Sequence, residues 1–236
     1  MKRITQFIGW VLNRIVKLPK NIAAYVANLT TPIVPGRVVC HSHSFQQYSC
    51  NPRYLTEYLH KHHPEFEIYW VFRKGANTSE LPKGDKSVRF RTWEYLKLMA
   101  SAEFVFSNVR TDPWRVYWHK RRGQKYVMLW HGGVSLKRIE ADAIDALSFS
   151  YIYRAKADSR ICDLMISGCR MQTELQAKSF WYDGEIMERG IPRNDIFFDT
   201  ERRKHLRLYI ANHYGIDPTS RIVLYAPTFR SNHSTE

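Results

Sequence analysis

One short segment combines residue types that are suited to proton transfer. His131, Gly132 and Gly133 come directly after the apolar run Tyr126–Trp130. If this run is a strand of a parallel sheet, the imidazole lies at its carboxyl end, where α/β proteins build their sites. An imidazole with an ordinary pKa of about 6.5 can act as a general base, and glycines allow a ligand to approach the backbone. A histidine held by local hydrogen bonds beside a tight turn is the alternative interpretation.

Cations and a hydroxyl stand near two predicted strand ends. Lys137 and Arg138 follow the glycines, and they are expected either to bind phosphate or to lie on a solvated face. Thr228 and Arg230 follow the apolar run Ile222–Ala226 and are suited to phosphate contact, since hydroxyl and guanidinium groups both donate hydrogen bonds to anions.

A third candidate segment is Gly190–Asp195, with the sequence GIPRND. Its proline fixes a turn, and Arg193 is close enough in sequence to reach an anion bound there. A purely structural turn is the favoured interpretation. Asn194 or Asp195 is also expected to cap a helix that starts near Ile196.

Metal, cofactor and nucleic-acid sites are less well supported. The histidines of His41–His43 and His60–His63 have no acidic or cysteine partner at ligand spacing, so no metal is predicted. No P-loop, G-x-G-x-x-G or H-E-x-x-H motif occurs, and no cofactor is expected. The basic and aromatic run Trp114–Arg122 is compatible with nucleic-acid binding, but no recognisable module accompanies it, so no nucleic-acid partner is predicted.

Short apolar runs alternate with helical patterns from Arg37 onward. This order predicts an α/β domain with a doubly wound, Rossmann-like parallel sheet, because near-continuous apolar strands suit a sheet buried on both faces. The expected strands are Arg37–His41, Glu67–Phe72, Glu103–Phe106, Tyr126–Trp130, Leu164–Ser167 and Ile222–Ala226. The expected helices are Pro52–His62, Trp93–Ala100, Arg170–Phe180 and Glu201–Tyr214.

The pattern also predicts three parts of the chain. Residues 1–36 form a basic amphipathic segment, residues 37–198 form the Rossmann-like domain, and residues 199–236 form a linker helix with the first strand of a further domain. A parallel strand needs neighbours in a sheet. The strand predicted at Ile222–Ala226 is therefore interpreted as the opening of a second, truncated domain.

Positive charge is concentrated at the amino end. The chain of 236 residues carries 36 Lys and Arg against 22 Asp and Glu, a net charge of +14, and no acidic residue precedes Glu57. On a helix, the apolar side chains of Ile4, Ile8, Val11, Leu12, Ile15 and Leu18 share one face, with Lys2, Lys17 and Lys20 opposite. This pattern is typical of a segment in an anionic membrane interface, and an ordinary surface helix packed on the domain is the alternative.

Other features of the sequence bear on the compartment. The hydrophobic fraction of 44% is too high for a disordered chain. Four cysteines are too few for a disulfide scaffold, which favours free thiols in a reducing cytosol. No run suits a spanning helix or a cleaved signal peptide. We therefore expect a peripheral protein at the cytoplasmic face of the membrane.

The order of the motifs resembles the CDP-glycerol glycerophosphotransferase family, which contains teichoic acid and capsule polymerases and primases. The resemblance runs from about Val38 to Arg230 and rests on five ordered segments. They are SCNPRY, PEFEIYWVFR, GQKYVMLWHGG with LKRIEAD, MISGCRMQTELQAKSFWYDGEIMERGIPRND, and VLYAPTFR. The family usually has Thr-Pro after W-H-G, whereas this chain has Gly133-Val134.

The resemblance implies an activity and a set of roles. It implies a two-domain GT-B type transferase of which this chain is the N-terminal, acceptor-side half, with CDP-glycerol held mainly by the C-terminal domain. His131 matches the family's catalytic base, which would deprotonate an acceptor hydroxyl that attacks the β-phosphate and releases CMP. Gly132, Gly133, Lys137, Arg138, Arg193, Asn194, Thr228 and Arg230 are the expected substrate-binding residues.

The expected partners follow from the same resemblance. They are CDP-glycerol, a polyanionic lipid-linked acceptor, the membrane surface through residues 1–35, and an oligomer or partner chain that supplies the second domain. The alternatives are a non-catalytic fragment that binds membrane or polyanion, and a related nucleotide-sugar glycosyltransferase.

Overall fold

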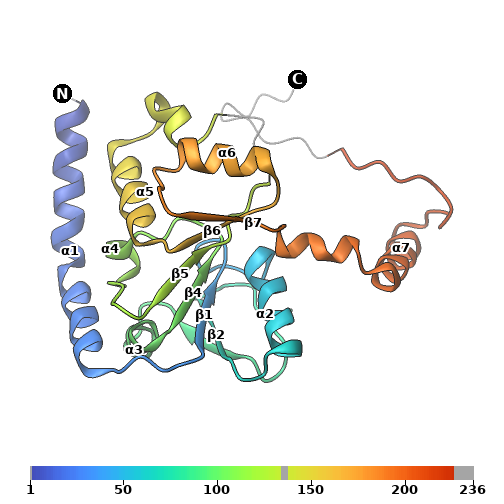
Figure 1. The fold of residues 1–236 in the computed structure, drawn as a ribbon, viewed down its shortest axis with the longest axis horizontal. Coiled ribbons are helices and arrows are strands. Elements are labelled where there is room, and N and C mark those ends of the chain that lie inside the picture. Colours follow the sequence, from blue (N-terminus) through green and yellow to red (C-terminus); the bar gives the residue numbers. More distant parts are fainter. Residues whose placement is uncertain (1, 134–137, 226–236) are drawn as a thin grey trace. The chain divides into compact units, whose positions relative to one another are not determined.

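A computed structural model describes residues 2–133 and 138–225, with the side chains of residues 2–7 left aside. The chain divides into two compact units, residues 1–194 and residues 195–236. The first unit holds the sheet and is shown in Figure 1 from blue to orange.

Within the described residues, seven parallel strands form one sheet in the order β3-β2-β1-β4-β5-β6-β7. The strands are β1 Arg37–His41, β2 Glu67–Phe72, β3 Lys86–Arg89, β4 Phe104–Ser107, β5 Lys125–Met128, β6 Leu164–Ser167 and β7 Glu185–Glu188. The sheet is wound outward in both directions from the β1–β4 pair, so its topological switch point lies between these two strands. This confirms the predicted doubly wound, Rossmann-like α/β sheet, and ligands of such sheets bind beyond the switch point.

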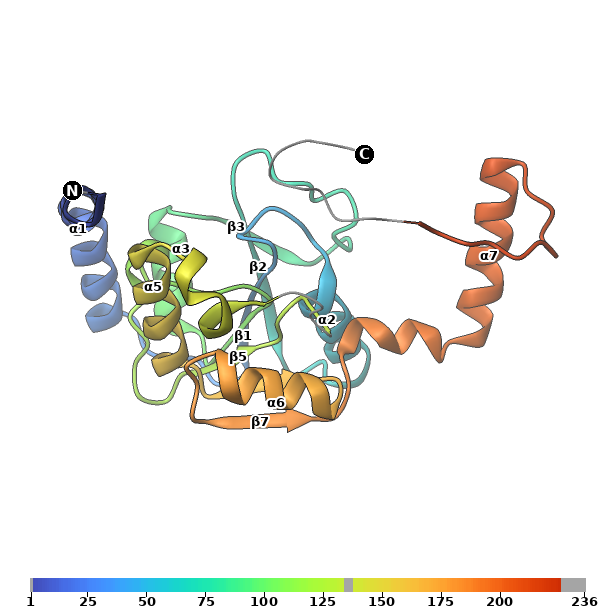
Figure 2. The ribbon, with the colours of Figure 1, turned by 90° about the horizontal axis from the view of Figure 1, so that it is seen from above.

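Helices cover both faces of the sheet because the central strands are apolar on both sides. Val39 and Val105 contribute to one core cluster, whereas Val38 and Cys40 contribute to the other. Figure 2 shows α1, α3 and α5 on the first side and α2 on the opposite side. The helices of this unit are α1 Lys2–Thr30, α2 Cys50–His62, α3 Trp93–Ser101, α4 Pro113–Val116, α5 Phe149–Ile161 and α6 Arg170–Ser179, with a 3-10 helix at Glu140–Ala146.

Helix α1 packs on the domain with its polar side. Asn21 donates to the Trp114 carbonyl oxygen at 3.1 Å, Asn28 donates to that of His119 at 2.9 Å, and Ala24 and Ala27 are buried. The apolar side of the helix faces solvent, with Ile8, Leu12 and Ile15 exposed by 52%, 57% and 60%. The alternative of a surface helix that buries its apolar stripe is therefore wrong. No described helix has both the length and the hydropathy that crossing a bilayer requires.

The second unit contains α7, Thr200–Tyr214, with a 3-10 helix at Pro192–Phe197 on its boundary. Asp199 caps α7 by accepting from the Arg202 N–H at 2.9 Å, so the expected cap at Asn194 or Asp195 is wrong. The strand predicted at Ile222–Ala226 is also not formed over residues 222–225, while Ala226 lies outside the described residues. These residues are exposed and pair with no described strand, so the ladder hydrogen bonds of a strand are missing.

Candidate active site

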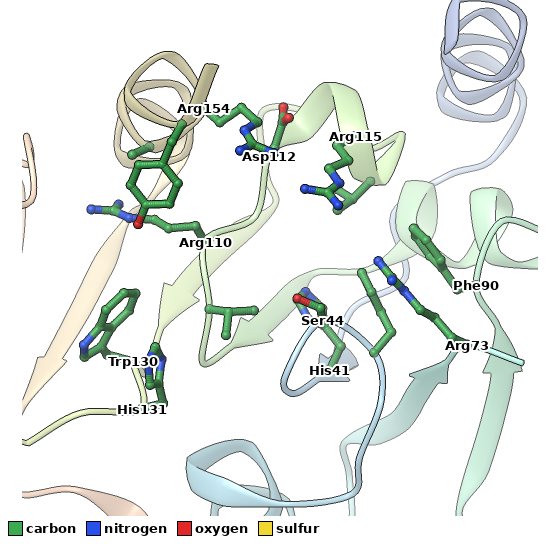
Figure 3. A pocket seen from close by; sticks show the side chains of 15 residues that line it. His41, Ser44, Arg73, Phe90, Arg110, Asp112, Arg115, Trp130, His131 and Arg154 are labelled. Carbon is green, nitrogen blue, oxygen red and sulfur yellow. The ribbon is translucent and has the colours of Figure 1, made fainter. Parts of the chain in front are cut away.

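The loops that follow β1, β2, β4 and β5 meet at the carboxyl edge of the sheet and enclose a cavity of about 360 Å³. Figure 3 shows His131 and Trp130 on one side of it and Arg73 and Phe90 on the other. Arg110, Arg115 and Arg154 also line the cavity. The cavity is thus placed where the sheet topology favours a ligand site, and its lining is strongly cationic.

His131 is held in a defined tautomer. Its Nδ1 lies 2.8 Å from the backbone carbonyl oxygen of Asn108. A carbonyl oxygen can only accept, so Nδ1 carries the proton and donates it, which leaves the lone pair on Nε2. The ring packs beside Trp130, with 4.3 Å between ring centroids. When the ring is neutral, this arrangement leaves Nε2 as the basic nitrogen, as a general base requires.

The surroundings of His131 favour the neutral ring. Burial of the ring lowers the pKa of His131 below its ordinary value, although the residue as a whole is exposed to solvent. The hydrogen bond to Asn108 opposes this shift, while the neighbouring His43 and the charge of Arg193 add to it. At neutral pH the ring is therefore mainly unprotonated and able to accept a proton.

Two buried asparagines hold the loop that carries His131. Asn51, at the start of α2, donates to the carbonyl oxygens of Leu129 and Trp130 at 2.9 and 2.7 Å. Asn108 accepts from the His43 N–H at 2.9 Å through its side-chain oxygen. Asn108 follows β4 directly, so its position beside a strand end could have identified it. Asn51 lies in the SCNPRY segment at the start of α2, away from any strand end, so only the motif pointed to it.

The two predicted glycines lie next to the histidine, and the space is tighter at Gly132 than at Gly133. A Cβ at Gly132 would lie 3.3 Å from Trp130 Nε1, and one at Gly133 would lie 3.6 Å from Ile191 Cδ1. Neither glycine has positive φ, so a side chain at position 132 would be opposed by the Trp130 ring and not by backbone conformation. Gln172 of α6 donates to the Gly132 carbonyl oxygen at 3.1 Å and fixes this turn.

Arg193 lies at the same edge but contacts protein atoms. Its backbone N–H donates to Asn51 Oδ1 at 3.3 Å, and its Nη1 donates to Cys50 Sγ at 3.2 Å. The GIPRND segment is thus connected to the loop of His131 through α2, as the structural-turn interpretation predicts. Asn194 is exposed, and its N–H donates to the Ile191 carbonyl oxygen at 2.8 Å.

The remaining predicted residues are not brought to the site by the described structure. Arg138 is exposed. Lys137, Thr228 and Arg230 lie outside the described residues. Their roles in phosphate binding stay predictions.

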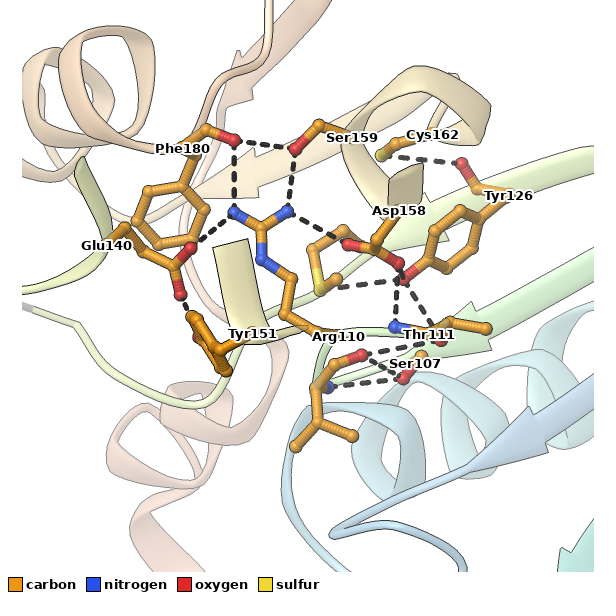
Figure 4. A network of polar contacts seen from close by, with 12 residues as sticks. Ser107, Arg110, Thr111, Tyr126, Glu140, Tyr151, Asp158, Ser159, Cys162 and Phe180 are labelled. Carbon is orange, nitrogen blue, oxygen red and sulfur yellow. Dashed lines mark hydrogen bonds and ion pairs between the residues drawn. The ribbon is translucent and has the colours of Figure 1, made fainter. Parts of the chain in front are cut away.

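A buried arginine organises the wall behind the cavity. Arg110 Nη1 donates to Asp158 Oδ2 at 2.9 Å, and its Nη2 donates to Glu140 Oε2 at 3.0 Å (Figure 4). Asp158 also accepts from the Thr111 N–H at 2.7 Å and from the Tyr126 hydroxyl at 2.9 Å. Burial opposes the charge on Arg110, but attraction to the two carboxylates outweighs it and the pKa of Arg110 is raised. The network joins the loop after β4 to β5, to α5 and to the 3-10 helix that begins at Glu140.

The arginines of the cavity were not predicted from the sequence. Arg73 follows β2 directly and Arg110 stands three residues after β4, so position at a strand end could have identified both. Arg115 and Arg154 lie on the helices α4 and α5 and reach the cavity only through tertiary packing, which leaves no sequence signal.

The other sequence motifs have local roles. His60 pairs with Asp85 at 3.0 Å, and among the described residues no three His, Cys, Asp or Glu side chains cluster as metal ligands. The basic run Trp114–Arg122 packs against α1, where Arg121 Nη2 donates to the Thr31 carbonyl oxygen at 2.9 Å. All four cysteines are unpaired.

The similar proteins described next are all named as teichoic acid polymerases. The teichoic acid poly(glycerol phosphate) polymerase of Staphylococcus epidermidis is 29% identical over 206 residues, which is 85% of this chain and 28% of that protein. The polymerase of the same name from Bacillus spizizenii is 30% identical over 203 residues, which is 83% of this chain and 50% of that protein. A structure of a variant of the wall teichoic acid polymerase TagF, soaked with CDPG, matches 99% of this chain and 59% of its own with a TM-score of 0.76 and 26% identity.

These matches define the family and its extent here. The chain spans between 28% and 50% of the two curated relatives. The model of the CDP-glycerol:poly(glycerophosphate) glycerophosphotransferase family matches residues 23–236, which include the whole sheet and the loop of His131. This chain therefore belongs to the CDP-glycerol:poly(glycerophosphate) glycerophosphotransferase family.

Proposed function

We propose that this chain forms the acceptor side of a transferase that moves glycerol phosphate from CDP-glycerol to a glycerophosphate acceptor. Nε2 of His131 takes the proton of an acceptor glycerol hydroxyl, whose oxygen forms a bond to the β-phosphorus of CDP-glycerol. The bond between that phosphorus and the bridging oxygen breaks, and CMP leaves with the bridging oxygen. The hydrogen bond from His131 Nδ1 to the Asn108 carbonyl oxygen is the observation that carries this proposal.

The charges around His131 support a substrate of this class. Both the donor and a glycerophosphate chain are polyanions, and cations near the reacting phosphoryl group offset its developing charge. Four arginines line the cavity beside the histidine, against one aspartate, Asp112. Buried carboxylates balance the charge of Arg110, so Arg73, Arg115 and Arg154 supply the cationic lining. By the family resemblance, CDP-glycerol is held mainly by a second domain.

Release of CMP tests the role of His131. The unsubstituted chain, His131→Ala and His131→Gln are compared with CDP-glycerol and a glycerophosphate-primed lipid acceptor, each alone and fused to the donor-binding domain of the Staphylococcus epidermidis relative. The Gln side chain can still donate to the Asn108 carbonyl but cannot act as the base. Both variants are expected to lose about 10²- to 10⁴-fold in turnover.

The matched control is His62→Gln, which changes an exposed histidine on α2. It is expected to keep the turnover of the unsubstituted chain. Equal turnover in His131→Gln and the unsubstituted chain would contradict the proposal that His131 acts as the general base. No CMP release from the folded chain or from its fusion would remove the transferase proposal.

We also propose that α1 binds the cytoplasmic face of the cell membrane and so brings the protein to a lipid-linked acceptor. The apolar side of this helix is exposed over several turns, and Lys20 is exposed near it. An amphipathic helix with an exposed apolar side and basic residues inserts into an anionic interface through both contributions. Burial of one Leu or Ile side chain contributes about 1.5–3 kcal/mol, so a few such residues suffice for binding.

Co-sedimentation with anionic vesicles tests the membrane proposal. The double variant Leu12→Glu, Ile15→Glu in the full chain is expected to lower vesicle affinity by about a hundredfold, at tenfold or more for each residue. The control Leu208→Glu changes an equally exposed leucine of α7 and is expected to have no effect. Equal vesicle binding by the double variant and the control would contradict the proposal.

A further inference from the structure

A second cavity of about 410 Å³ adjoins the one beside His131. It lies between α1, α4 and the start of α5, and its lining includes Trp10, Arg14 and Ser148. Asp112, Arg115 and Arg154 line both cavities. The two cavities therefore share a wall, and together they reach from α1 to the candidate base.

The two arginines of this shared wall, and Arg73 in the first cavity alone, lack ion-pair partners among the described residues. Arg73, Arg115 and Arg154 form no ion pair with a carboxylate in the described part of the chain. Among the described residues, Arg154 Nε donates only to the Ser150 carbonyl oxygen, at 2.9 Å, and the buried Nε of Arg73 has no hydrogen-bond partner. In Figure 3, Arg73 and Arg115 extend toward each other from opposite sides of the cavity.

These cations repel one another in the absence of an anion. Burial, followed by the charges of Arg115 and Arg91, lowers the pKa of Arg73. Burial and the charge of Arg115 likewise lower the pKa of Arg154, against the opposing effect of Asp112. Guanidinium groups form strong, often bidentate hydrogen bonds to phosphate, so a bound phosphate would relieve this repulsion and supply the missing partners.

The end of this wall at α1 holds a further cation. The Arg14 guanidinium lies 4.5 Å from the ring centroid of Trp10, 4.8 Å from that of Trp114 and 5.0 Å from that of Tyr153. The aromatic rings fix this charge at the side of the domain where α1 exposes its apolar face. A polyanion that starts at this helix thus meets Arg14, then Arg154 and Arg115, and then Arg73 and His131.

We infer that the two cavities form one track for the phosphodiester groups of the acceptor chain, in which Arg14, Arg154, Arg115 and Arg73 bind successive phosphates behind the hydroxyl that His131 activates. This inference rests on the proposed function for the direction of the chain. It extends that function by naming the residues that hold non-reacting units of the acceptor. The track selects an acceptor with several phosphates over a single glycerol phosphate, because only a longer chain occupies both cavities.

Binding of a soluble glycerol phosphate oligomer, without lipid or CDP-glycerol, tests the track by calorimetry on the full chain. Arg115→Gln and Arg154→Gln are each expected to weaken oligomer binding by about tenfold or more, since a charge-assisted hydrogen bond is lost. The slope of log affinity against log salt is expected to fall by about one for each arginine removed. Arg115→Lys, which keeps the charge, is expected to retain part of the affinity.

The matched control is Arg160→Gln, because Arg160 is exposed on the same helix as Arg154 and has no described ion pair. It is expected to bind the oligomer like the unsubstituted chain. Equal losses in Arg160→Gln and Arg154→Gln would overturn the track in favour of general charge attraction. Unchanged oligomer affinity in Arg115→Gln and Arg154→Gln, with thermal unfolding showing folded protein, would also overturn it.

A phosphate on a lipid headgroup has the same chemistry as one in the acceptor chain, so vesicles of phosphatidylglycerol form a second arm. The arginine variants are expected to bind these vesicles as the unsubstituted chain does. Variants that lose vesicle binding but keep oligomer binding would overturn the track. CMP release tests the base proposal separately. Weakened oligomer binding by the arginine variants supports the track, and loss of turnover in the His131 variants supports the base. Each proposal can therefore fail without the other.

Discussion

Two arginines that lie five residues apart in the sequence, Arg110 and Arg115, have opposite surroundings. Arg110 is 9% exposed at its side chain and is held by two carboxylates that are themselves 2% and 0% exposed. Arg115, five residues later, is exposed and has no described acidic partner. A buried charge must be paired to be tolerated, whereas an unpaired cation beside a cavity has its hydrogen-bonding capacity free for a ligand. Whether an arginine is paired with a carboxylate therefore distinguishes a structural arginine from one that is available to bind a ligand.

The same comparison applies to the two halves of the His131 environment. On the protein side, Asn108 and Asn51 satisfy the backbone of the loop and fix the ring. On the cavity side, Arg73, Arg115 and Arg154 form no ion pair with a described carboxylate. Catalysis on an anionic substrate needs a rigidly held base and nearby hydrogen-bond donors that are not already occupied. The surroundings of His131 provide both.

The largest effect is expected from Arg110→Gln. This change leaves Asp158 and Glu140 buried without their cation, and it should lower the free energy of unfolding by about 3–5 kcal/mol. Urea unfolding followed by tryptophan fluorescence measures this change. The control Arg170→Gln removes an exposed pair with Glu174 and should change the free energy by less than about 1 kcal/mol. Equal losses in the two variants would show that the Arg110 network is not a structural element.

A smaller effect is expected from the buried histidine at the far side of the cavity. Burial, with a further contribution from the charge of Arg73, lowers the pKa of His41 to about 3 from 6.5. Below pH 6.5 the unfolded chain binds a proton that the folded chain refuses, so the contribution of His41 to stability falls as the pH falls from 6.5 toward 3. The slope approaches about 1.4 kcal/mol per pH unit within this range.

Comparison with His41→Gln isolates this slope from other titrating groups. The variant cannot bind the proton in either state, so its stability should decline less between pH 6.5 and pH 4 than that of the unsubstituted chain, as measured by urea unfolding at a series of pH values. Parallel pH profiles for the two proteins would contradict the expected proton exclusion at His41.

The apolar central strands were predictable, whereas the edge strands were not. β1, β2 and β6 have the predicted bounds because strands buried on both faces give continuous apolar runs. β3 (KSVR) and β7 (EIME) lie at the two edges of the sheet, and their polar, largely exposed residues give no such run. Helix α5 was missed for a similar reason, since its buried positions are Ala155, Asp158 and Ser159, which form no apolar stripe.

The candidate site divides in the same way. His131 was predicted because it follows an apolar strand directly, and the structure places it at the expected sheet edge. The arginine track was not predicted because Arg14, Arg115 and Arg154 are far apart in sequence and meet only where α1, α4 and α5 pack together. Local patterns identify residues at strand ends, but sites built by helix packing need the tertiary structure.

The smallest effect on stability is expected at Arg115, for which a loss of oligomer binding is proposed. Arg115→Gln removes an exposed cation that pairs with no described carboxylate, so the free energy of unfolding should change by no more than about 0.5 kcal/mol. Relief of its repulsion with Arg73 and Arg154 favours a small gain rather than a loss. Urea unfolding of this variant beside Arg110→Gln measures the contrast. A loss of several kcal/mol in Arg115→Gln would assign Arg115 to the architecture, whereas unchanged stability with weakened oligomer binding would assign it to the ligand.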